Sequence, residues 1–454
     1  MSGGLAKAAE AQQQKKVESA NSESIKMLAF LGRGTNEALL RSVASCLKPT
    51  LSIKPYRGET DVAPEVLRKS PWCDLVFLGS WKGYEEVFAA SKWSRYVNRI
   101  PRFFELCDKS ILCDILTKAH AVSAPDCLVL PRDVSYVKNW ASKGHSLILK
   151  PSDGAKGDCI RVVPPGDGQE AAVLRAIAGR PVETNNKTFV LQQYISAPLL
   201  LHKRKFDLRL YVAFVFDESS TLDTLDSPAR SSPTGTAFLC RHGLARLCSQ
   251  PYEPPNDENC AHARVHLTNF AVNKGAGKQE SGAVPLKMSA ASALSELART
   301  SRKRGGTGAA AGALTPEKLW SGIHHTSYEV ATAVLPFLQK AVADHWATGE
   351  REVTPGVPTP QDHFARRRRF QVAGLDIMLD SDGAPKVLEL NANPSLSIHG
   401  ENGISIEAVD EAVKVPMLVD LLKLAVLRDD TVNPLTKMLP EACNGLCWNF
   451  LCAV

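Results

Sequence analysis

The sequence of 454 residues lacks the features that would place it in a membrane or outside the cell. No apolar run approaches the roughly 18 residues that a membrane-spanning helix needs, so no membrane partner is expected. Residues 1–24 have no apolar centre, so their sequence does not indicate a signal peptide. We expect them to form a disordered tail. The last four residues, LCAV, do not begin with cysteine, so prenylation is not predicted. We therefore expect a cytoplasmic protein.

The sequence also lacks a Cys-x-x-Cys pair, although it contains twelve cysteines. Cys443, Cys447 and Cys452 cluster near the C-terminus, but no histidine lies nearby to complete a zinc-binding set. The other cysteines are scattered along the chain. Free thiols in a reducing compartment are the state that this spacing favours.

Neither sign of charge is in large excess, because 54 Lys and Arg face 48 Asp and Glu and give a net charge of +6. This balance is too weak to indicate a nucleic-acid partner, and it is compatible with an acidic protein partner. Basic residues cluster at 202–205, 301–304 and 365–370, where the simplest interpretation is a solvated loop edge. Aromatic residues do not interleave with these clusters in an RNA-binding pattern.

Short apolar runs that alternate with helix-like segments predict an α/β (α+β) fold. A small N-terminal α/β domain is expected at 25–92. Further strands are predicted at 146–151, 188–195, 206–216, 236–240 and 370–380. The polar stretch 217–235 and the Gly-, Ala- and Ser-rich stretch 274–314 are expected to be mobile insertions, the second with a helical piece near 286–300. Residues 404–427 have helical spacing, and 431–454 are expected to form a C-terminal tail.

A glycine-containing loop follows the strand at 146–151. Lys150 lies at the end of this strand, and the loop places Lys156 between Gly154 and Gly157. Glycines let backbone N–H groups approach an anion closely, and lysines supply point charges. The segment matches neither of the common phosphate-binding motifs, and a plain hairpin turn with exposed lysines would have the same sequence.

Two carboxylates interrupt apolar strands on either side of a predicted turn at 380–385. Asp376 lies in GLDIMLD and Glu389 in KVLELNANPSLSI, so a hairpin would place them opposite each other. Asn391 shares a strand face with Glu389 because it lies two residues further on. Oxygen ligands of this kind suit Mg²⁺ held together with nucleotide phosphates, while a purely structural carboxylate pair would be costly to bury.

Polar residues also alternate along the strand at 206–216. Lys205, Asp207 and Arg209 share one face of it, which could equally be exposed to solvent. Arg246, Thr268 and Asn269 occur in RHGLARL and HLTNF, and none of the three indicates a site by itself.

Taken in order, these segments resemble the tubulin tyrosine ligase-like family, whose catalytic core is an ATP-grasp fold. The resemblance covers about residues 73–425 and rests on ordered motifs: KPSDGAKGDCI, LQQYISAPLLLHKRKFDLRLYV, RHGLARLCSQPYE, HLTNFAVNK, GLDIMLD and LELNANPSL. It implies a central domain at 93–195 and a C-terminal domain at 196–430, with the nucleotide between them.

The resemblance also implies roles for individual residues. ATP would be held by Lys150, Lys156, Gly157, Gln192, Gln193, Tyr194, Ile195, Lys205, Asp207, Thr268 and Asn269. Mg²⁺ would be bound by Asp376, Glu389 and Asn391. The γ-phosphate, the acceptor carboxylate or the incoming amino acid would be faced by Arg209, Arg246 and Lys287.

The implied activity is ATP-dependent ligation of an amino acid to the acidic C-terminal tail of tubulin, through an acyl-phosphate. Residues 157–160, GDCI, resemble the tyrosine-adding enzyme, whereas NPSL and residues 410–424 resemble the glutamate- and glycine-adding members. Glutamate is favoured, with tyrosine or glycine as alternatives; an inactive tubulin- or microtubule-binding member is an alternative of another class.

Basic residues 302–304 and 366–369 are expected to attract the acidic tail. The enzyme is expected to act as a monomer at cytoplasmic microtubules, or in a cilium, flagellum or basal body.

Overall fold

The computed structural model describes most of the chain beyond the N-terminal tail. The described residues are 24–31, 37–56, 66, 70, 73–79, 94–154, 157–178, 188–219, 233–274, 285–304, 314–349, 366–400, 405–427 and 445–454. Residues 1–23 of the predicted tail lie outside them, as do 220–232, 275–284 and 305–313 of the two predicted insertions.

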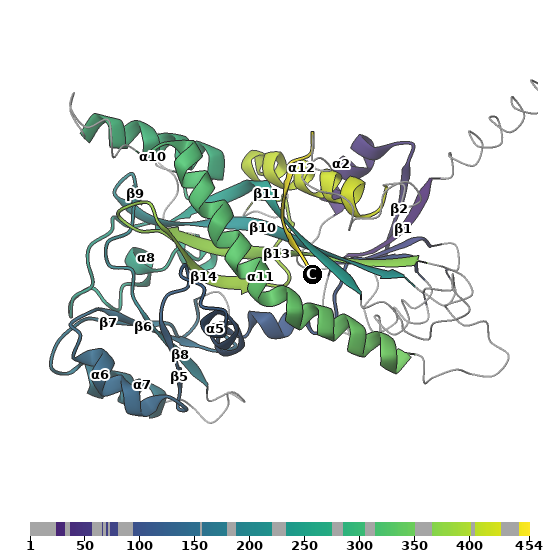
Figure 1. The fold of residues 1–454 in the computed structure, drawn as a ribbon. Helices are drawn as coiled ribbons and strands as arrows, with labels where there is room; N and C mark the ends of the chain where they lie inside the picture. Colours follow the sequence, from purple (N-terminus) through teal and green to yellow (C-terminus); the bar gives the residue numbers. More distant parts are fainter. Residues whose placement is uncertain are drawn as a thin grey trace, which may run out of the picture.

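A large mixed sheet runs through the molecule, and eleven strands of the described chain belong to it (Figure 1). Its main path is β12-β11-β10-β13-β4-β3-β1-β2, with β14 paired to β13, β15 to β11 and β9 to β10. The strands are β1 (Ile25–Phe30), β2 (Leu51–Tyr56), β3 (Leu75–Leu78), β4 (Tyr96–Val97), β9 (Leu200–Leu201), β10 (Arg204–Ser219), β11 (Thr234–Leu247), β12 (Lys287–Ser289), β13 (Arg366–Leu379), β14 (Pro385–Asn391) and β15 (Trp448–Ala453).

The N-terminal segment has the predicted α/β pattern. Strand β1 pairs in parallel with both β2 and β3, and helix α2 (Glu37–Leu47) connects β1 to β2. Parallel strands need such a crossover, which explains the helix between them. The short β4 pairs in parallel with β3 and β13, so this segment continues the sheet of the C-terminal half.

Both faces of the large sheet are covered by helices (Figure 1). Along β10, the even-numbered side chains from Phe206 to Phe216 pack in one core with α10 (Ala290–Arg304) and α11 (Pro316–Gly349). On the opposite face, Tyr211, Ala213 and Val215 pack with α2 and α12 (Ala408–Ala425). The same face carries Lys205, Asp207 and Arg209 at the other end of the strand. One face of β10 is therefore apolar at one end and polar at the other.

A second, antiparallel sheet has the strand order β5-β8-β6-β7. Its strands are β5 (Cys127–Leu130), β6 (Leu147–Pro151), β7 (Arg161–Val163) and β8 (Phe189–Gln193). Helices α6 (Val137–Ala141) and α7 (Gln169–Ala178) pack on it, and α5 (Lys109–Lys118) contributes Leu112 and Leu116 to the core of the large sheet. The strand predicted at 146–151 is β6, which pairs antiparallel with β7; the alternative of a plain hairpin with exposed lysines is wrong for Lys150, which is buried.

Several expectations are corrected by this arrangement. Residues 448–453, which we expected in a tail, form β15, and Trp448 is fully buried against α12. The helical piece expected near 286–300 is confirmed as α10, which follows β12. This part of the predicted insertion is not mobile, because Ala290, Ala293 and Leu297 are buried in the core.

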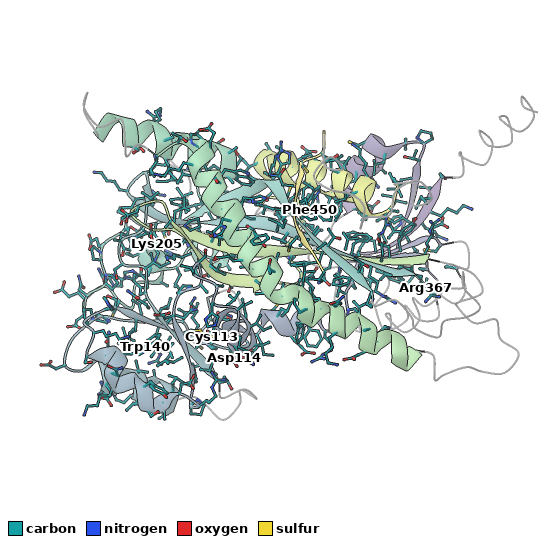
Figure 2. The ribbon with its side chains drawn as sticks, in the orientation of Figure 1. Cys113, Asp114, Trp140, Lys205, Arg367 and Phe450 are labelled. Atoms are coloured by element: carbon teal, nitrogen blue, oxygen red, sulfur yellow. A yellow bond between two sulfur atoms is a disulfide. The ribbon has the colours of Figure 1, made fainter. Side chains whose placement is uncertain are left out.

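The arginine run at 366–369 also differs from its prediction. It belongs to β13, and Arg367, Arg368 and Arg369 are buried, so these three arginines do not form the expected surface for an acidic tail. Arg368 is accommodated because Nε donates to Asp217 Oδ1 at 2.5 Å and Nη1 to the Ala425 carbonyl at 3.0 Å. Arg367 lies far along the sheet from Lys205 (Figure 2). The side chains of 302–304 lie outside the described residues.

The expectation of free thiols is wrong for one pair. Cys113 in α5 and Cys127 in β5 form a disulfide with their Cα atoms 6.5 Å apart, because the chain turns back between the two elements and brings them side by side. Over the ranges that the structure describes, no helix is sufficiently long and apolar to cross a bilayer.

Candidate active site

A cleft lies between the small sheet and the polar ends of β10, β13 and β14. It contains about 800 Å³ of space not occupied by atoms when its open mouth is included. Most of the predicted site residues line it: Lys150, Gly157, Gln192, Gln193, Tyr194, Ile195, Lys205, Asp207, Thr268, Asn269, Asp376 and Glu389. Segments that are far apart in the sequence therefore converge here.

The wall formed by the end of β8 combines aromatic and polar groups. The Tyr194 hydroxyl lies 2.9 Å from Nδ1 of His266, and the Lys205 ammonium lies 3.7 Å from the centroid of the Tyr194 ring. Burial and the nearby Lys205 lower the pKa of His266 to about 4, so its imidazole is neutral at pH 7. A cation over an aromatic face is held by the ring's quadrupole, which fixes Lys205 at this wall.

Two buried lysines supply positive charge to the cleft. Lys150 donates from Nζ to Gln192 Oε1 at 2.8 Å. Burial lowers the pKa of Lys150 to about 8 and that of Lys205 to about 7, because desolvation disfavours the charged form. An anionic ligand in the cleft would reverse this effect and favour the protonated lysines.

The loop after β6 approaches α9 (Phe270–Asn273) closely. Gly157 has φ +86°, and a Cβ atom there would lie 3.1 Å from Val272 Cγ2 and 3.2 Å from Asn269 Oδ1. Glycine is favoured because this φ is strained for residues with a side chain and because a Cβ atom would be in tight contact with both neighbours. The loop backbone thus packs beside Asn269. Lys156 lies outside the described residues.

The predicted carboxylate hairpin is present. Asp376 of β13 pairs directly with Glu389 of β14, next to a bulge. Asn391 lies on the same side, with Nδ2 3.4 Å from Asp376 Oδ2 and 3.3 Å from Glu389 Oε1. Burial, and then the charge of Asp376, raise the pKa of Glu389 above its ordinary value. The Glu389 anion is therefore held in an unfavourable environment.

Two arginines lie behind the carboxylates. Arg246 donates from Nε to Asp207 Oδ1 at 2.7 Å and from Nη2 to Asp376 Oδ2 at 2.8 Å, so it bridges two acids. Arg209 donates from Nη2 to Asp376 Oδ2 at 2.9 Å and from Nε to Oδ1. Burial alone would raise the pKa of Asp376, but the two arginines hold it well below its usual range. Thr268 Oγ1 donates to Asp207 Oδ2 at 2.6 Å.

The structure places Lys287 beside this network rather than in the cleft lining. Lys287 of β12 is the antiparallel neighbour of Arg246 in β11. Its Nζ donates to Asp410 Oδ2 at 2.5 Å and lies 4.6 Å from the centroid of the Phe270 ring. Lys414 contacts the other oxygen of Asp410 at 2.7 Å, so one buried acid joins two lysines.

The cleft also contains residues that the sequence did not indicate. Lys109, the first residue of α5, donates from Nζ to the Gly154 carbonyl at 2.6 Å and lies 3.9 Å from Glu389 Oε2. It follows the helix N-cap Asp108, so its sequence is that of an ordinary helix start. Apolar walls are added by Ile148, Met378 and Leu388.

A cation site can be tested against these donors. The described residues contain no cluster of three or more His, Cys, Asp or Glu that could hold a metal by itself. Asp376, Glu389 and Asn391 instead bring two carboxylates and an amide together, and a half-turn of the amide would exchange its N and O atoms. The disfavoured charge of Glu389 would be stabilised by a cation. The donor set fits Mg²⁺ whose other ligands come from water and phosphates.

A family model described as the tubulin-tyrosine ligase family matches residues 89–220 and 230–433, and these ranges include every element that lines the cleft. Individual proteins are also similar to this chain. Tubulin polyglutamylase TTLL11 of Mus musculus is 28% identical over 428 residues, which cover 87% of this chain and 51% of the relative.

Two further relatives have the same description. Tubulin polyglutamylase TTLL11 of Homo sapiens is 31% identical over 299 residues, covering 64% of this chain and 34% of the relative. Tubulin polyglutamylase TTLL7 of Mus musculus is 26% identical over 386 residues, covering 82% of this chain and 35% of the relative. The chain thus spans about half or less of the length of these curated relatives.

Proposed function

The chain belongs to the tubulin-tyrosine ligase family, and from this premise we propose that it is an ATP-dependent ligase that adds glutamate to the C-terminal tail of tubulin. The observation that carries the proposal is the Asp376–Glu389 pair, in which buried Asp376 is held by Arg209 and Arg246 and half-buried Glu389 lines the cleft. A structural role alone does not account for a carboxylate kept at a raised pKa in a cleft lining.

The residues of the small sheet and of β10 would bind the nucleotide. Gln192, Gln193, Tyr194 and Ile195 would line the base, with Lys205 and Asp207 beside the base and ribose. Thr268 and Asn269 would contact the nucleotide from the other side. Lys150 and the loop residues Lys156 and Gly157 would hold the phosphates, which agrees with the buried ammonium of Lys150 and the close packing of Gly157 on Asn269.

Bound ATP would supply the γ-phosphoryl group that converts the acceptor carboxylate to an acyl-phosphate, with ADP as the leaving group. The amine of the second amino acid would then attack the acyl carbon, and phosphate would leave. Arg209 and Arg246 would offset the repulsion between the two anionic reactants and stabilise the transferring group. Asp376 and Asp207 fix the orientation of these guanidinium groups. Lys287, one strand away, is proposed to act on the acceptor side.

Mg²⁺ would be held by Glu389, Asn391 and Asp376 and would neutralise phosphate charge. Glu389 is the carboxylate best able to bind it, because both oxygens of Asp376 already accept hydrogen bonds from arginine. Arginine contacts would hold Asp376 in place while Glu389 contacts the metal.

Glutamate is proposed because the relatives are described as polyglutamylases. Tyrosine and glycine are the alternatives from the same class. The proposed setting is the cytoplasm at microtubules, including those of a cilium, flagellum or basal body, with tubulin as the macromolecular partner and a monomer as the active form.

The decisive experiment offers labelled glutamate, tyrosine and glycine separately to tubulin with Mg-ATP and maps the modified tail by mass spectrometry. We expect incorporation of glutamate alone. Incorporation of tyrosine or glycine instead would show that this amino acid, and not glutamate, is the one that the enzyme adds. Binding of Mg-ATP and tubulin with no incorporation of any of the three would favour a non-catalytic tubulin- or microtubule-binding protein.

A further inference from the structure

The disulfide between Cys113 and Cys127 lies next to residues that line the cleft. Cys113 is buried within α5, and Cys127, the first residue of β5, is half-buried. The cross-link is a covalent tie between α5 and β5, which are not paired by backbone hydrogen bonds and also meet where Thr117 Oγ1 lies 4.0 Å from Cys127 Sγ. Helix α5 carries Lys109, which lines the cleft, and β5 pairs with β8, which carries the lining residue Gln192.

On the helix side, Cys113 lies four residues after Lys109, on the same face of α5. Lys109 is the residue whose Nζ contacts the Gly154 carbonyl in the loop after β6 and faces Glu389 Oε2 at 3.9 Å. Because the two side chains are one helical turn apart, fixing Cys113 restricts the rotation and sliding of α5 that would move Lys109. The disulfide therefore constrains the position of a charge in the cleft.

On the strand side, Cys127 pairs with Gln192 across β5 and β8. Gln192 lines the cleft and accepts the hydrogen bond from Lys150. Cys127 is thus on the strand next to Gln192, the hydrogen-bond partner of buried Lys150. Two elements that position lining residues of the cleft are tied together through the Cys113–Cys127 bond.

The space between these elements is incompletely filled. A small cavity lies beside the disulfide, lined by Cys113, Cys127, Leu112, Leu116 and Pro125 among others. Lys109, Gln192, Pro125 and Leu388 line both this cavity and the cleft. This unfilled space beside the disulfide would accommodate a shift of α5 once the covalent tie is broken.

We propose that Cys113–Cys127 is a reversible thiol–disulfide modification site that sets the nucleotide affinity of the cleft, an inference that rests on the proposed function. With the bond closed, Lys109 and Gln192 are held in the arrangement described above. With it open, α5 samples additional positions, and only part of the population is competent to bind. The apparent dissociation constant rises by the inverse of that fraction.

The co-reactant is a small thiol of the glutathione class. A thiolate attacks one sulfur of the disulfide, the S–S bond breaks, and a mixed disulfide forms while the other cysteine leaves as a thiolate and takes up a proton. A second small thiol then attacks the mixed disulfide and releases the remaining cysteine. Two small thiols are oxidised to their disulfide, and Cys113 and Cys127 are reduced. Half-buried Cys127 is the more accessible sulfur.

The test measures the dissociation constant of Mg-ATP by calorimetry for the full chain, once equilibrated with oxidised glutathione and once with dithiothreitol. Mass spectrometry of alkylated thiols establishes the state of the bond in each sample. We expect the reduced protein to bind ATP about fivefold more weakly. The double variant C113S/C127S should match the reduced wild type under both conditions, whereas C46S, at an exposed cysteine of α2, should respond as the wild type does.

Each other outcome is decisive. Equal ATP affinity of the oxidised and reduced wild type would overturn the inference and leave the proposed function intact. No ATP binding in either state would overturn the proposed function itself. A redox response that persists in C113S/C127S would assign the effect to another thiol, such as exposed Cys159 in the loop. If C113S/C127S does not fold, the two wild-type measurements alone decide.

Discussion

Arg246 bridges Asp207 and Asp376, with 2.7 Å between Nε and Asp207 Oδ1 and 2.8 Å between Nη2 and Asp376 Oδ2. Arg246 lies on β11, next to β10 in the sheet. Its guanidinium thus joins a carboxylate of β10 to a carboxylate of β13, the strand on the far side of β10. The bridge is buried at the base of the cleft. It fixes the acid that pairs with Glu389 and the acid that accepts from Thr268.

Replacing Arg246 with alanine should destabilise the fold as well as the site. Two buried carboxylates would lose a charged partner, and loss of one member of a buried ion pair costs about 3 kcal/mol or more. We expect the free energy of unfolding to fall by about that amount in urea denaturation. R241A, at an exposed arginine of the same strand, should change it by less than about 1 kcal/mol. Equal effects of the two variants would contradict the role of the bridge.

Replacing Glu389 with glutamine should separate activity from stability. The raised pKa of Glu389 means that its ionisation is less favourable in the folded chain than in the unfolded one, so its ionisation reduces stability at pH 7. E389Q should therefore keep or raise the free energy of unfolding while turnover falls about 100-fold or more. The matched control D382N changes an exposed acid at the tip of the same hairpin and should affect neither property. A destabilised E389Q with normal turnover would contradict both expectations.

Nucleotide binding should depend on pH through Lys150 and Lys205. Burial lowers their pKa values to about 8 and about 7, so both lose charge as the pH rises through this range. ATP affinity should fall between pH 7 and 9. Binding at pH 8 should take up protons, because the phosphates favour charged lysines; calorimetry in buffers of different ionisation enthalpy measures this uptake. Proton release on binding would contradict the assignment.

The same shifts have a consequence for stability. Between about pH 7 and the ordinary lysine pKa of 10.5, the unfolded chain binds more protons than the folded one at these two positions. Their contribution to the free energy of unfolding therefore rises with pH across that window. Comparing K150M with the wild type at pH 7 and pH 9.5 isolates the part due to Lys150. A difference between the two proteins that does not change with pH would argue against the lowered pKa.

The C-terminal strand should contribute strongly to stability. Trp448 is fully buried, and its Nε1 donates to the Met417 carbonyl at 3.1 Å. W448A should lower the free energy of unfolding by about 3–5 kcal/mol, the usual cost of truncating a buried large aromatic residue. V454A, at a residue with 38% of its surface exposed, is the control and should be nearly neutral. A neutral W448A would restore the interpretation of 431–454 as a tail.

The parts of the site that depend on local pattern could be predicted from the sequence. Strand alternation predicts that Lys205, Asp207 and Arg209 lie on one face of their strand. The turn at 380–385 predicts that Asp376 and Glu389 lie opposite each other on paired strands, as they do. These features follow from the period of two in a strand and from the geometry of a hairpin.

The features that depend on distant segments could not be predicted. Whether Arg246 reaches Asp376 depends on strand order, which local pattern does not contain. Lys109 reaches the cleft only because α5 packs between the two sheets. The consecutive arginines 367–369 have the sequence of a solvated run, yet they are buried in a strand where Asp217 and a helix-end carbonyl serve as partners for Arg368. Strand β15 is a short apolar segment whose partner, β11, lies two hundred residues earlier.

We propose that ATP bound in the cleft around Glu389 phosphorylates the acceptor carboxylate and so activates it for ligation. The most direct measurement counts ADP formed and labelled glutamate incorporated into tubulin in the same reaction, for the wild type, E389Q and D382N. We expect one ADP for each glutamate with the wild type and D382N, and neither product above background with E389Q. Glutamate incorporation by E389Q at the wild-type rate, or incorporation by the wild type without ADP formation, would contradict the account.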